Sequence, residues 1–151
     1  MSNSLKSFVK PLVPDWLSEH WRQRRYAAEQ ARYKDLPLHQ VFEEIYADHV
    51  WDRTGSDAPY RSGPGSAAAI THGYEKFVVD YLLRHPKAKR LVDIGCGDFQ
   101  VAGRILAALA EQGRQIDYVG CDIASNVVAH NIETFSRPGI MFQVLDATQT
   151  A

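Results

Sequence analysis

The sequence predicts an α/β protein in which short parallel strands alternate with helices. Three apolar runs carry this prediction, because each has the length of a buried strand and ends where the chain must turn. These runs are residues 91–94, 118–123 and 140–145. The segments between them, residues 99–109 and 126–135, repeat apolar side chains at helical spacing. The order is therefore strand, helix, strand, helix, strand, which is typical of a parallel sheet.

A glycine turn follows the first strand and is the most informative local feature. Gly95 and Gly97 let the backbone turn sharply and lie against a ligand without interference from a Cβ atom. The second strand ends at Asp122, which lies 25 residues after Gly97, near the offset of about 20 at which an acidic residue binds a ribose diol. The pattern predicts the first βαβαβ half of a Rossmann-like sheet that binds a nucleoside cofactor.

A nicotinamide or flavin dinucleotide site is the main alternative. Such a site would place a third glycine three residues after the second, where this chain has Gln100. Asp93 and Asp98 also flank the turn, and two carboxylates beside a pyrophosphate would repel it. These residues favour a ligand that carries an ammonium group.

The same residues resemble the motifs of the class I S-adenosylmethionine-dependent methyltransferases. Residues 93–97 resemble the first motif, Asp122 resembles the acidic end of the second strand, and residues 145–147 resemble the third motif. The resemblance covers about residues 66–151. It implies that S-adenosylmethionine is the cofactor and that it is bound by Asp93, Gly95, Cys96, Gly97, Asp98, Asp122, Ile123, Asp146 and Ala147.

The resemblance also implies a role for each acidic residue. Asp93 or Asp98 would favour the amino group of the cofactor, Asp122 would accept its ribose hydroxyl groups, and Asp146 with the Ala147 backbone would bind the adenine edge. Structural alternatives exist for the same residues. Asp93 is suited to accept hydrogen bonds from loop amides, Asp122 is suited to cap the next helix, and the whole turn is suited to packing alone.

The N-terminal half is expected to form a helical extension and loop over residues 1–65, ahead of a partial cofactor-binding domain over residues 66–151. A helix is expected at about residues 38–50. Residues 51–66 contain three glycines and two prolines and lack periodicity, which indicates a loop that ends at Ser66 as the N-cap of the next helix. The apolar face expected on that helix consists of Ile70, Tyr74, Phe77, Val78, Tyr81 and Leu82.

The pattern Phe42-x-x-Ile45-Tyr46, followed by Trp51 and then by SGPGS at residues 62–66, is similar to the N-terminal extension of a group of bacterial methyltransferases, some of them found among surface-polysaccharide genes. The similarity implies a loop that closes over the cofactor or the acceptor. A flexible linker that ends in an ordinary helix cap is the alternative. The similarity alone suggests a small-molecule or saccharide acceptor.

Composition predicts a soluble cytoplasmic protein. The net charge of −1 gives no bulk attraction to nucleic acid or anionic lipid, and no run approaches the roughly 18 apolar residues of a spanning helix. The six histidines lack the spacing of metal ligands, and Cys96 and Cys121 are expected to be small buried residues without a disulfide. The N-terminal arm, residues 1–36, is basic and amphipathic; packing on its own domain is favoured over peripheral contact with a membrane or a partner.

The predicted reaction is transfer of the sulfonium methyl group to a nucleophile, in which the protein chiefly aligns two bound partners. No catalytic base is predicted, because the family draws its acceptor-side residues from the fourth strand onward. We expect the chain to be truncated after the third strand and inactive by itself. The alternative is a noncatalytic nucleoside-binding module, or a remnant that requires a partner chain.

Overall fold

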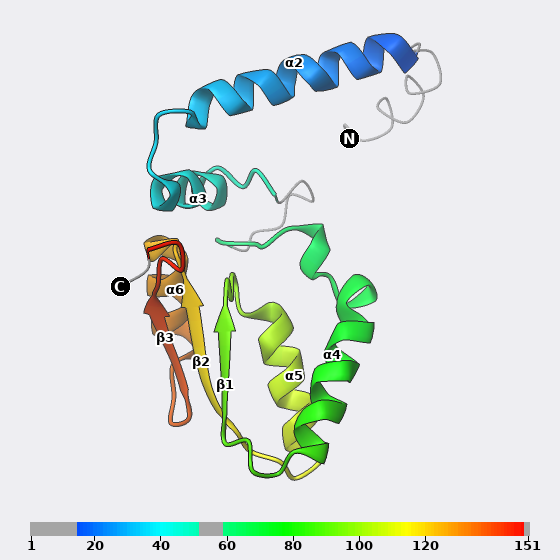
Figure 1. Cartoon of the computed structure of the whole chain (residues 1–151), viewed down its shortest axis with the longest axis vertical. Coiled ribbons are helices and arrows are strands. Elements are labelled where there is room, and N and C mark those ends of the chain that lie inside the picture. Colours follow the sequence, from blue (N-terminus) through cyan, green and yellow to red (C-terminus); the bar gives the residue numbers. More distant parts are fainter. Residues whose placement is uncertain (1–14, 52–58, 150–151) are drawn as a thin grey trace, which may run out of the picture. The chain divides into compact units, whose positions relative to one another are not determined.

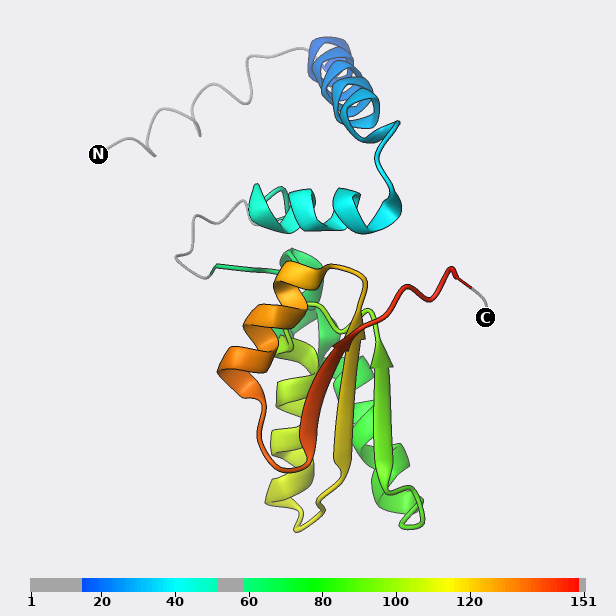
Figure 2. The same cartoon turned by 90° about the vertical axis from the view of Figure 1, so that its left-hand side faces the viewer.

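Three parallel strands form one sheet in the computed structural model, which describes residues 15–51 and 59–149 (Figure 1). The strands lie in the order β1 (Arg90–Ile94), β2 (Asp117–Asp122) and β3 (Ile140–Val144). Helix α5 (Gln100–Glu111) connects β1 to β2, and α6 (Ser125–Phe135) connects β2 to β3. Both helices lie on the same face of the sheet (Figure 2). The predicted fold class, a Rossmann-like βαβαβ unit with parallel strands, is confirmed.

Aromatic side chains fill the core between this face of the sheet and its helices. Tyr118 of β2 is fully buried and lies 5.2 Å from Phe99 and 5.9 Å from Phe142, measured between ring centroids. Gly120 makes room for these rings, because a Cβ atom there would lie 2.7 Å from Phe142 Cδ1 and 3.0 Å from Tyr118 Cε1. The glycine within β2 is therefore a packing requirement rather than a turn.

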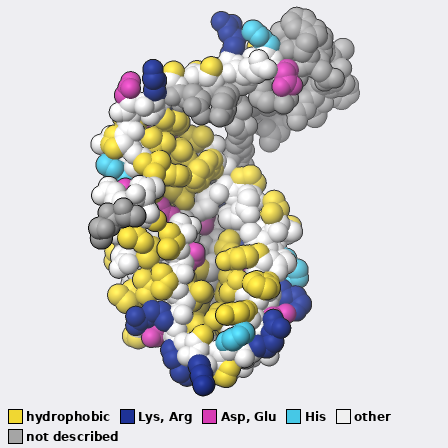
Figure 3. Space-filling model, viewed as in Figure 1, with side chains coloured by type: hydrophobic (Ala, Val, Ile, Leu, Met, Phe, Trp, Pro, Cys, Tyr) yellow, Lys and Arg dark blue, Asp and Glu magenta, His cyan; other side chains and the backbone are white. Residues whose placement is uncertain are grey.

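Helix α4 (Ala68–Arg84) precedes β1 and packs against α5. Its buried side is centred on Leu82, which packs with Ile105 and Leu109. Most of the apolar face expected from the sequence is instead exposed, at Ile70, Tyr74, Phe77 and Tyr81. Helical spacing correctly placed these side chains on one face of α4, but none of the described residues buries that face (Figure 3).

The second face of the sheet is also apolar and uncovered. Val92 and Ile94 of β1 are 53% and 64% exposed, and Met141 of β3 is 56% exposed. Figure 3 shows apolar side chains gathered over α4 and over the strands, with a hollow between the two areas. Among the described residues no strand pairs with the outer edge of β1. Parallel sheets are normally covered on both faces, so these areas are candidates for contact with a further layer.

Residue contacts divide the chain into the units Met1–Leu36 and Pro37–Ala151. The first contains α2 (Asp15–Tyr33), and the second contains α3 (Leu38–Ala47), η2 (Pro64–Ser66), α4 and the sheet. The boundary expected after residue 65 differs, because α3 packs against α6 and joins the sheet unit. Part of the predicted basic arm, residues 1–14, and part of the predicted loop, residues 52–58, lie outside the described residues. None of the described helices is long and apolar enough to cross a membrane.

The start of α4 differs from the sequence prediction, and the start of α6 is held by a second helix. Ser66 does not cap α4, whose N-cap is Ala67; the Ser66 hydroxyl donates to the Gly63 carbonyl at 2.7 Å. The N-cap of α6 is Ala124. The backbone N–H of the next residue, Ser125, donates to the Glu43 carboxylate at 3.2 Å, which places a negative charge from α3 at the helix N-terminus.

The substitution Gly120→Ala is expected to destabilise the folded chain by about 1–3 kcal/mol, because the added methyl group overpacks the space that Phe142 and Tyr118 occupy. Gly73→Ala in α4 is the matched control, since no atom lies within 4 Å of the position of its added Cβ atom. This control should stabilise the chain by about 0.5–1 kcal/mol through helix propensity. Urea unfolding measures both changes, and equal effects would contradict the packing described for β2.

Candidate functional site

The glycine turn lies at the carboxyl end of β1 and is held by hydrogen bonds from two other elements. The N–H groups of Gly95 and Cys96 donate to the Cys121 carbonyl at 2.8 and 3.0 Å. The N–H of Gly97 donates to Asp122 Oδ2 at 2.9 Å, and its carbonyl accepts from Asn131 Nδ2 at 2.7 Å. The peptide groups on both sides of Gly97 are thus fixed by β2 and by α6.

Asp122 has two structural partners and is 6% exposed. Besides the bond from Gly97, its Oδ1 accepts the N–H of Ala124 at 3.0 Å, at the start of α6. The helix-capping role considered from the sequence takes a different form, because the N-cap of α6 is Ala124 and there Asp122 binds only the N–H of that residue. It does not exhaust the carboxylate, because an ionised carboxylate has about four acceptor positions and two are used here. The predicted acceptance of ribose hydroxyl groups stays a prediction.

Asp98 is clamped by Ser62 from the loop that precedes η2. The Ser62 hydroxyl donates to Asp98 Oδ1 at 3.1 Å and its N–H donates to Asp98 Oδ2 at 3.0 Å, while the N–H of Asp98 donates to Ser62 Oγ at 3.0 Å. Gln100 Nε2 adds a bond to Asp98 Oδ2 at 2.6 Å. With 7% exposure and these partners, Asp98 acts as an anchor for the loop. Its predicted contact with a ligand amino group is not tested.

The SGPGS segment has a physical role at three of its positions. Besides the Ser62 clamp, Gly63 adopts a φ of +81° and a Cβ atom there would lie 2.9 Å from Trp51 Cβ, so only glycine fits without displacement. The carbonyl of Ser66 accepts from Arg104 Nη2 at 2.7 Å, and Arg104 Nε also donates to Glu75 Oε1 at 2.9 Å. The arginine holds the pKa of the Glu75 carboxyl below its usual range. These contacts fix the segment against the glycine turn and α5.

Asp93 points to the helix-covered face of the sheet, where Tyr118 donates a hydrogen bond to its Oδ2 at 3.0 Å. Burial raises the pKa of Asp93 above its ordinary value; the hydrogen bond from Tyr118 opposes this shift, and the charge of Asp122 adds to it. The sequence alternative in which loop amides hold Asp93 is not what the structure shows, since a phenol does so. A cation near Asp93 would restore its ordinary ionisation.

Cys96 is half-buried and carries no disulfide. Burial raises the pKa of its thiol to about 12, with smaller contributions from the charges of Asp122 and Asp93. A protonated thiol is a poor nucleophile, so Cys96 serves as a small residue of the turn. Cys121 is also free and fully buried. The described residues contain no group of three or more His, Cys, Asp or Glu side chains arranged to hold a metal ion.

Two cavities meet at the glycine turn and share Gly95 and Ser62 among their lining residues. The first, of about 370 Å³, lies beside Asp93, Cys96 and Asp98 and extends between α4 and α5. The second, of about 350 Å³, is lined on one side by strand-end residues of the predicted site and on the other by α3. Its predicted members are Gly95, Asp122, Ile123, Asp146 and Ala147. Gly97 lines neither cavity, because Ser62 and Tyr46 cover it.

Asp146 follows β3 and is fixed by residues just after it. Its Oδ1 accepts from the hydroxyl and the N–H of Thr148 at 2.6 and 2.9 Å, and its Oδ2 accepts from Gln149 Nε2 at 2.9 Å. These bonds lower the pKa of the Asp146 carboxyl and keep it ionised at neutral pH. The charge is thus held at the mouth of the second cavity, beside Ala147.

Sequence reasoning missed Asn131 and the contacts that Tyr46, Trp51 and Ser62 make. The resemblance that includes Tyr46, Trp51 and the SGPGS segment pointed to this part of the chain without identifying Asp98 as the partner of Ser62. The Tyr46 hydroxyl lies 3.4 Å from Ser62 Oγ, and burial raises its pKa to about 12. Asn131 is fully buried and holds Gly97 from the middle of α6, where its sequence context is that of an ordinary helix.

Comparisons with known proteins concern the fold. No family model and no curated protein matches the sequence. The solved structures to which the chain is similar include the CMeT domain of the citrinin polyketide synthase, at 18% identity and a TM-score of 0.45, and the DszA carbon methyltransferase, at 19% identity and a TM-score of 0.49. The matches cover 78% and 83% of this chain but only 28% and 34% of those two chains, so this chain spans about a third or less of their length.

The clamp between Ser62 and Asp98 is expected to contribute to stability. Ser62→Ala should destabilise the chain by about 1–3 kcal/mol, because the buried Asp98 carboxylate loses a donor and the Asp98 N–H loses its acceptor. Ser136→Ala, at an exposed position after α6, is the control and should change stability by less than about 0.5 kcal/mol. A double-mutant cycle with Asp98→Asn, measured by urea unfolding, isolates the pair. Additive effects would contradict the clamp.

Proposed function

We propose that the second cavity and the adjoining glycine turn bind S-adenosylmethionine and that the chain is the cofactor-binding part of a methyltransferase. One observation carries the proposal. Residues from the ends of all three strands, at Gly95, Asp122 and Ala147, line a single crevice at the carboxyl edge of the sheet. In open α/β sheets this edge is where nucleoside ligands bind.

The residues present fit the two halves of such a cofactor. Gly95 has a φ of +81° and no atom within 4 Å of its absent Cβ position, which leaves an open cradle where the two cavities meet. On one side, the free acceptor positions of Asp122 suit a ribose diol, and Asp146 suits the polar edge of an adenine. On the other side Asp93 suits an ammonium group, because its burial makes an unpaired charge unfavourable.

When bound, this cofactor supplies an electrophilic methyl group on a sulfonium. The chain's contribution is to position it. The hydrogen bonds to Gly97 and the Ser62 clamp hold the turn in one conformation, so the chain binds its ligand with little reorganisation. Cys96 is half-buried and protonated, and Tyr118 is fully buried and bonded to Asp93. Both residues therefore have structural roles around the turn and do not transfer protons.

The acceptor belongs to the same proposal, and a small molecule or a saccharide is the class that the SGPGS resemblance suggests. Transfer needs an acceptor-binding layer, and the uncovered face around Val92, Ile94 and Met141 is where such a layer would pack. The uncovered face also favours a second candidate, a noncatalytic nucleoside-binding module that works with a partner chain. Incubation with labelled S-adenosylmethionine and an extract of candidate acceptors, with and without a candidate partner polypeptide, separates the two. We expect no transfer by these 151 residues alone. Transfer once a partner polypeptide is added would favour the methyltransferase, and cofactor binding without any transfer would favour the module.

Isothermal titration calorimetry tests the binding proposal directly. S-adenosylmethionine and its demethylated product, S-adenosylhomocysteine, should bind with a stoichiometry of one, and NAD should bind at least tenfold more weakly. Tighter binding of NAD would contradict the proposal, as would the absence of binding by both adenosyl ligands to folded protein.

Asp122→Ala is expected to weaken binding of S-adenosylhomocysteine by about 1.5–3 kcal/mol, the scale of hydrogen bonds to a charged group. Asp117→Ala, at the exposed start of the same strand, is the matched control and should leave affinity unchanged. Calorimetry measures the difference in affinity, at a temperature where unfolding curves show that both variants are folded. Unchanged affinity in Asp122→Ala would remove this residue from the ligand site.

Gly97→Val should abolish binding, whereas Cys96→Ala should retain most of it. A Cβ atom on Gly97 would lie 2.1 Å from Ser62 Oγ, and a β-branched residue is strained at its φ of +53°. Cys96 contributes mainly a small side-chain volume. Calorimetric affinities and circular dichroism are recorded for both variants, and equal losses of affinity would assign the turn to packing alone.

Binding should depend on pH through Asp93. The ammonium group of the ligand pairs with the ionised carboxylate, which forms only above a pKa that burial has raised. Affinity for S-adenosylhomocysteine is therefore expected to fall as pH is lowered toward that raised pKa. Asp93→Asn should bind more weakly at neutral pH and should lose most of this dependence. Calorimetry at several pH values measures it, and parallel profiles for the two proteins would exclude Asp93.

A further inference from the structure

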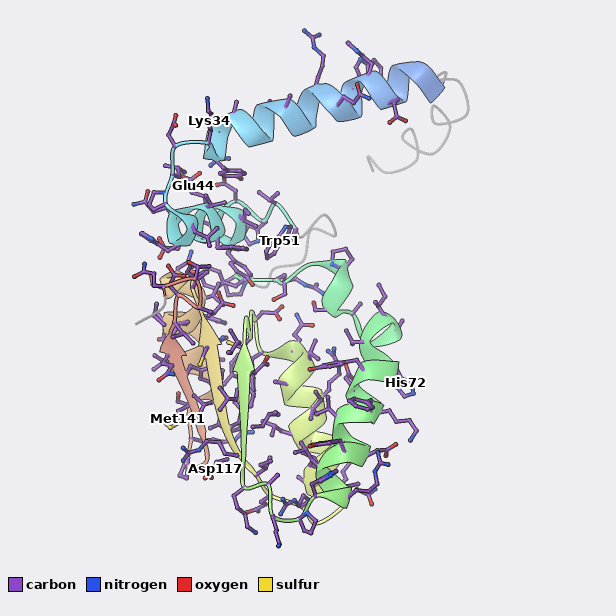
Figure 4. The ribbon with its side chains drawn as sticks, in the orientation of Figure 1. Lys34, Glu44, Trp51, His72, Asp117 and Met141 are labelled. Carbon is purple, nitrogen blue, oxygen red and sulfur yellow. The ribbon has the colours of Figure 1, made fainter. Side chains whose placement is uncertain are left out.

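The wall of the second cavity opposite the strand ends is aromatic and comes from outside the βαβαβ unit. It consists of Phe42 and Tyr46 on α3 and Trp51 just after it. Trp51 follows α3 by a few residues and lies next to the segment that leads into η2 (Figure 4). The facing wall contains Asp122, Ile123 and Asp146, so the two sides of one cavity differ in character.

Three contacts fix the indole of Trp51 in this wall. Its ring centroid lies 6.0 Å from that of Phe42 and 5.2 Å from that of Tyr46, with interplanar angles of 64° and 77°. These are edge-to-face arrangements, which aromatic pairs prefer. The backbone of Gly63 lies against Trp51 so closely that a Cβ atom would approach to 2.9 Å. Tyr46 itself is 4% exposed and packs on Ala124 and Val127 at the start of α6.

The wall has one side left for a ligand. Trp51 and Phe42 are partly exposed, unlike Tyr46, and both line the cavity. A purine is flat, with two apolar faces and a polar edge. The cavity has a partly exposed aromatic wall, which matches the faces of a purine, and on its other side hydrogen-bond acceptors and backbone groups, which match the polar edge. A purely structural cluster would instead bury all its rings, as Tyr46 is buried.

We infer that Phe42 and Trp51 form the surface on which the purine of the bound nucleoside stacks, so that residues 37–51 and the SGPGS segment belong to the cofactor site. This inference rests on the proposed function and adds to it a specificity wall that the strand motifs lack. Gly63 then has a defined part, because the close approach of its backbone holds Trp51 in place. Ser62, its neighbour, ties the same segment to the glycine turn through Asp98. The two halves of the site are thereby joined by consecutive residues.

Tryptophan fluorescence tests the inference on the full chain. The sequence has three tryptophans, so the double variant Trp16→Phe, Trp21→Phe leaves Trp51 as the sole reporter. Titration with S-adenosylhomocysteine and with adenosine should quench its emission saturably, and methionine should not. Trp51→Ala should lower the calorimetric affinity for S-adenosylhomocysteine about 5- to 150-fold, the range for stacking of one base on an aromatic side chain. Trp51→Phe should retain affinity within about threefold, since a ring remains.

Trp21→Ala, at a position 56% exposed on α2, is the matched control and should bind as the unchanged chain does. Binding by calorimetry without any change in Trp51 emission would overturn the inference, as would equal affinities for Trp51→Ala and the unchanged chain. These results leave the proposed function standing. If Trp51→Ala fails to fold, the emission titration and Trp51→Phe still decide the question. Absence of adenosyl-ligand binding by the unchanged chain would instead overturn the proposed function, and this inference with it.

Discussion

The immobilisation of Gly97 is the constraint on which the candidate site depends. Its N–H donates to Asp122, its carbonyl accepts from Asn131, and Ser62 Oγ occupies the place that a Cβ atom would need. Strand β2, helix α6 and the loop before η2 therefore meet at one residue. Because these bonds form within the protein, the turn is ordered before a ligand arrives, and a preordered site loses less free energy on binding.

Substitutions around Gly97 are expected to change the stability of the fold and the affinity for a ligand to different extents. Asp122 holds the turn, binds the N–H of Ala124 and lines the second cavity, so its substitution is expected to affect folding and binding together. Ser62 and Asp98 act mainly on the turn and the SGPGS segment. Trp51 lies on the other side of the cavity, so its substitution is expected to leave the hydrogen bonds to Gly97 intact. Variants at these positions therefore separate a loss of order in the turn from a loss of ligand contact.

The sequence was sufficient to predict the sheet and to place acidic residues at the strand ends, because strand periodicity, the glycine turn and the acid at the end of β2 are local patterns. It did not reveal the contacts between distant segments. Ser62 and Asp98 are 36 residues apart and Gly97 and Asn131 are 34 apart, and nothing in the spacing of such pairs identifies them. The apolar face of α4 shows the same limit. Periodicity placed Tyr74 and Phe77 on one face of the helix, but their burial depends on what packs against that face, and both are exposed.

Mapping ligand-induced shifts of backbone amides by two-dimensional NMR tests the location of the nucleoside site most directly. Titration with S-adenosylhomocysteine should produce its largest shifts at Gly95, Ile123 and Ala147, which lie around one crevice at the carboxyl ends of three strands. The opposite end of the sheet, at Lys89 and Gly139, should remain unchanged. Shifts concentrated at that opposite end, or spread along the exposed face of α4 with none at the glycine turn, would contradict a nucleoside site at the strand ends.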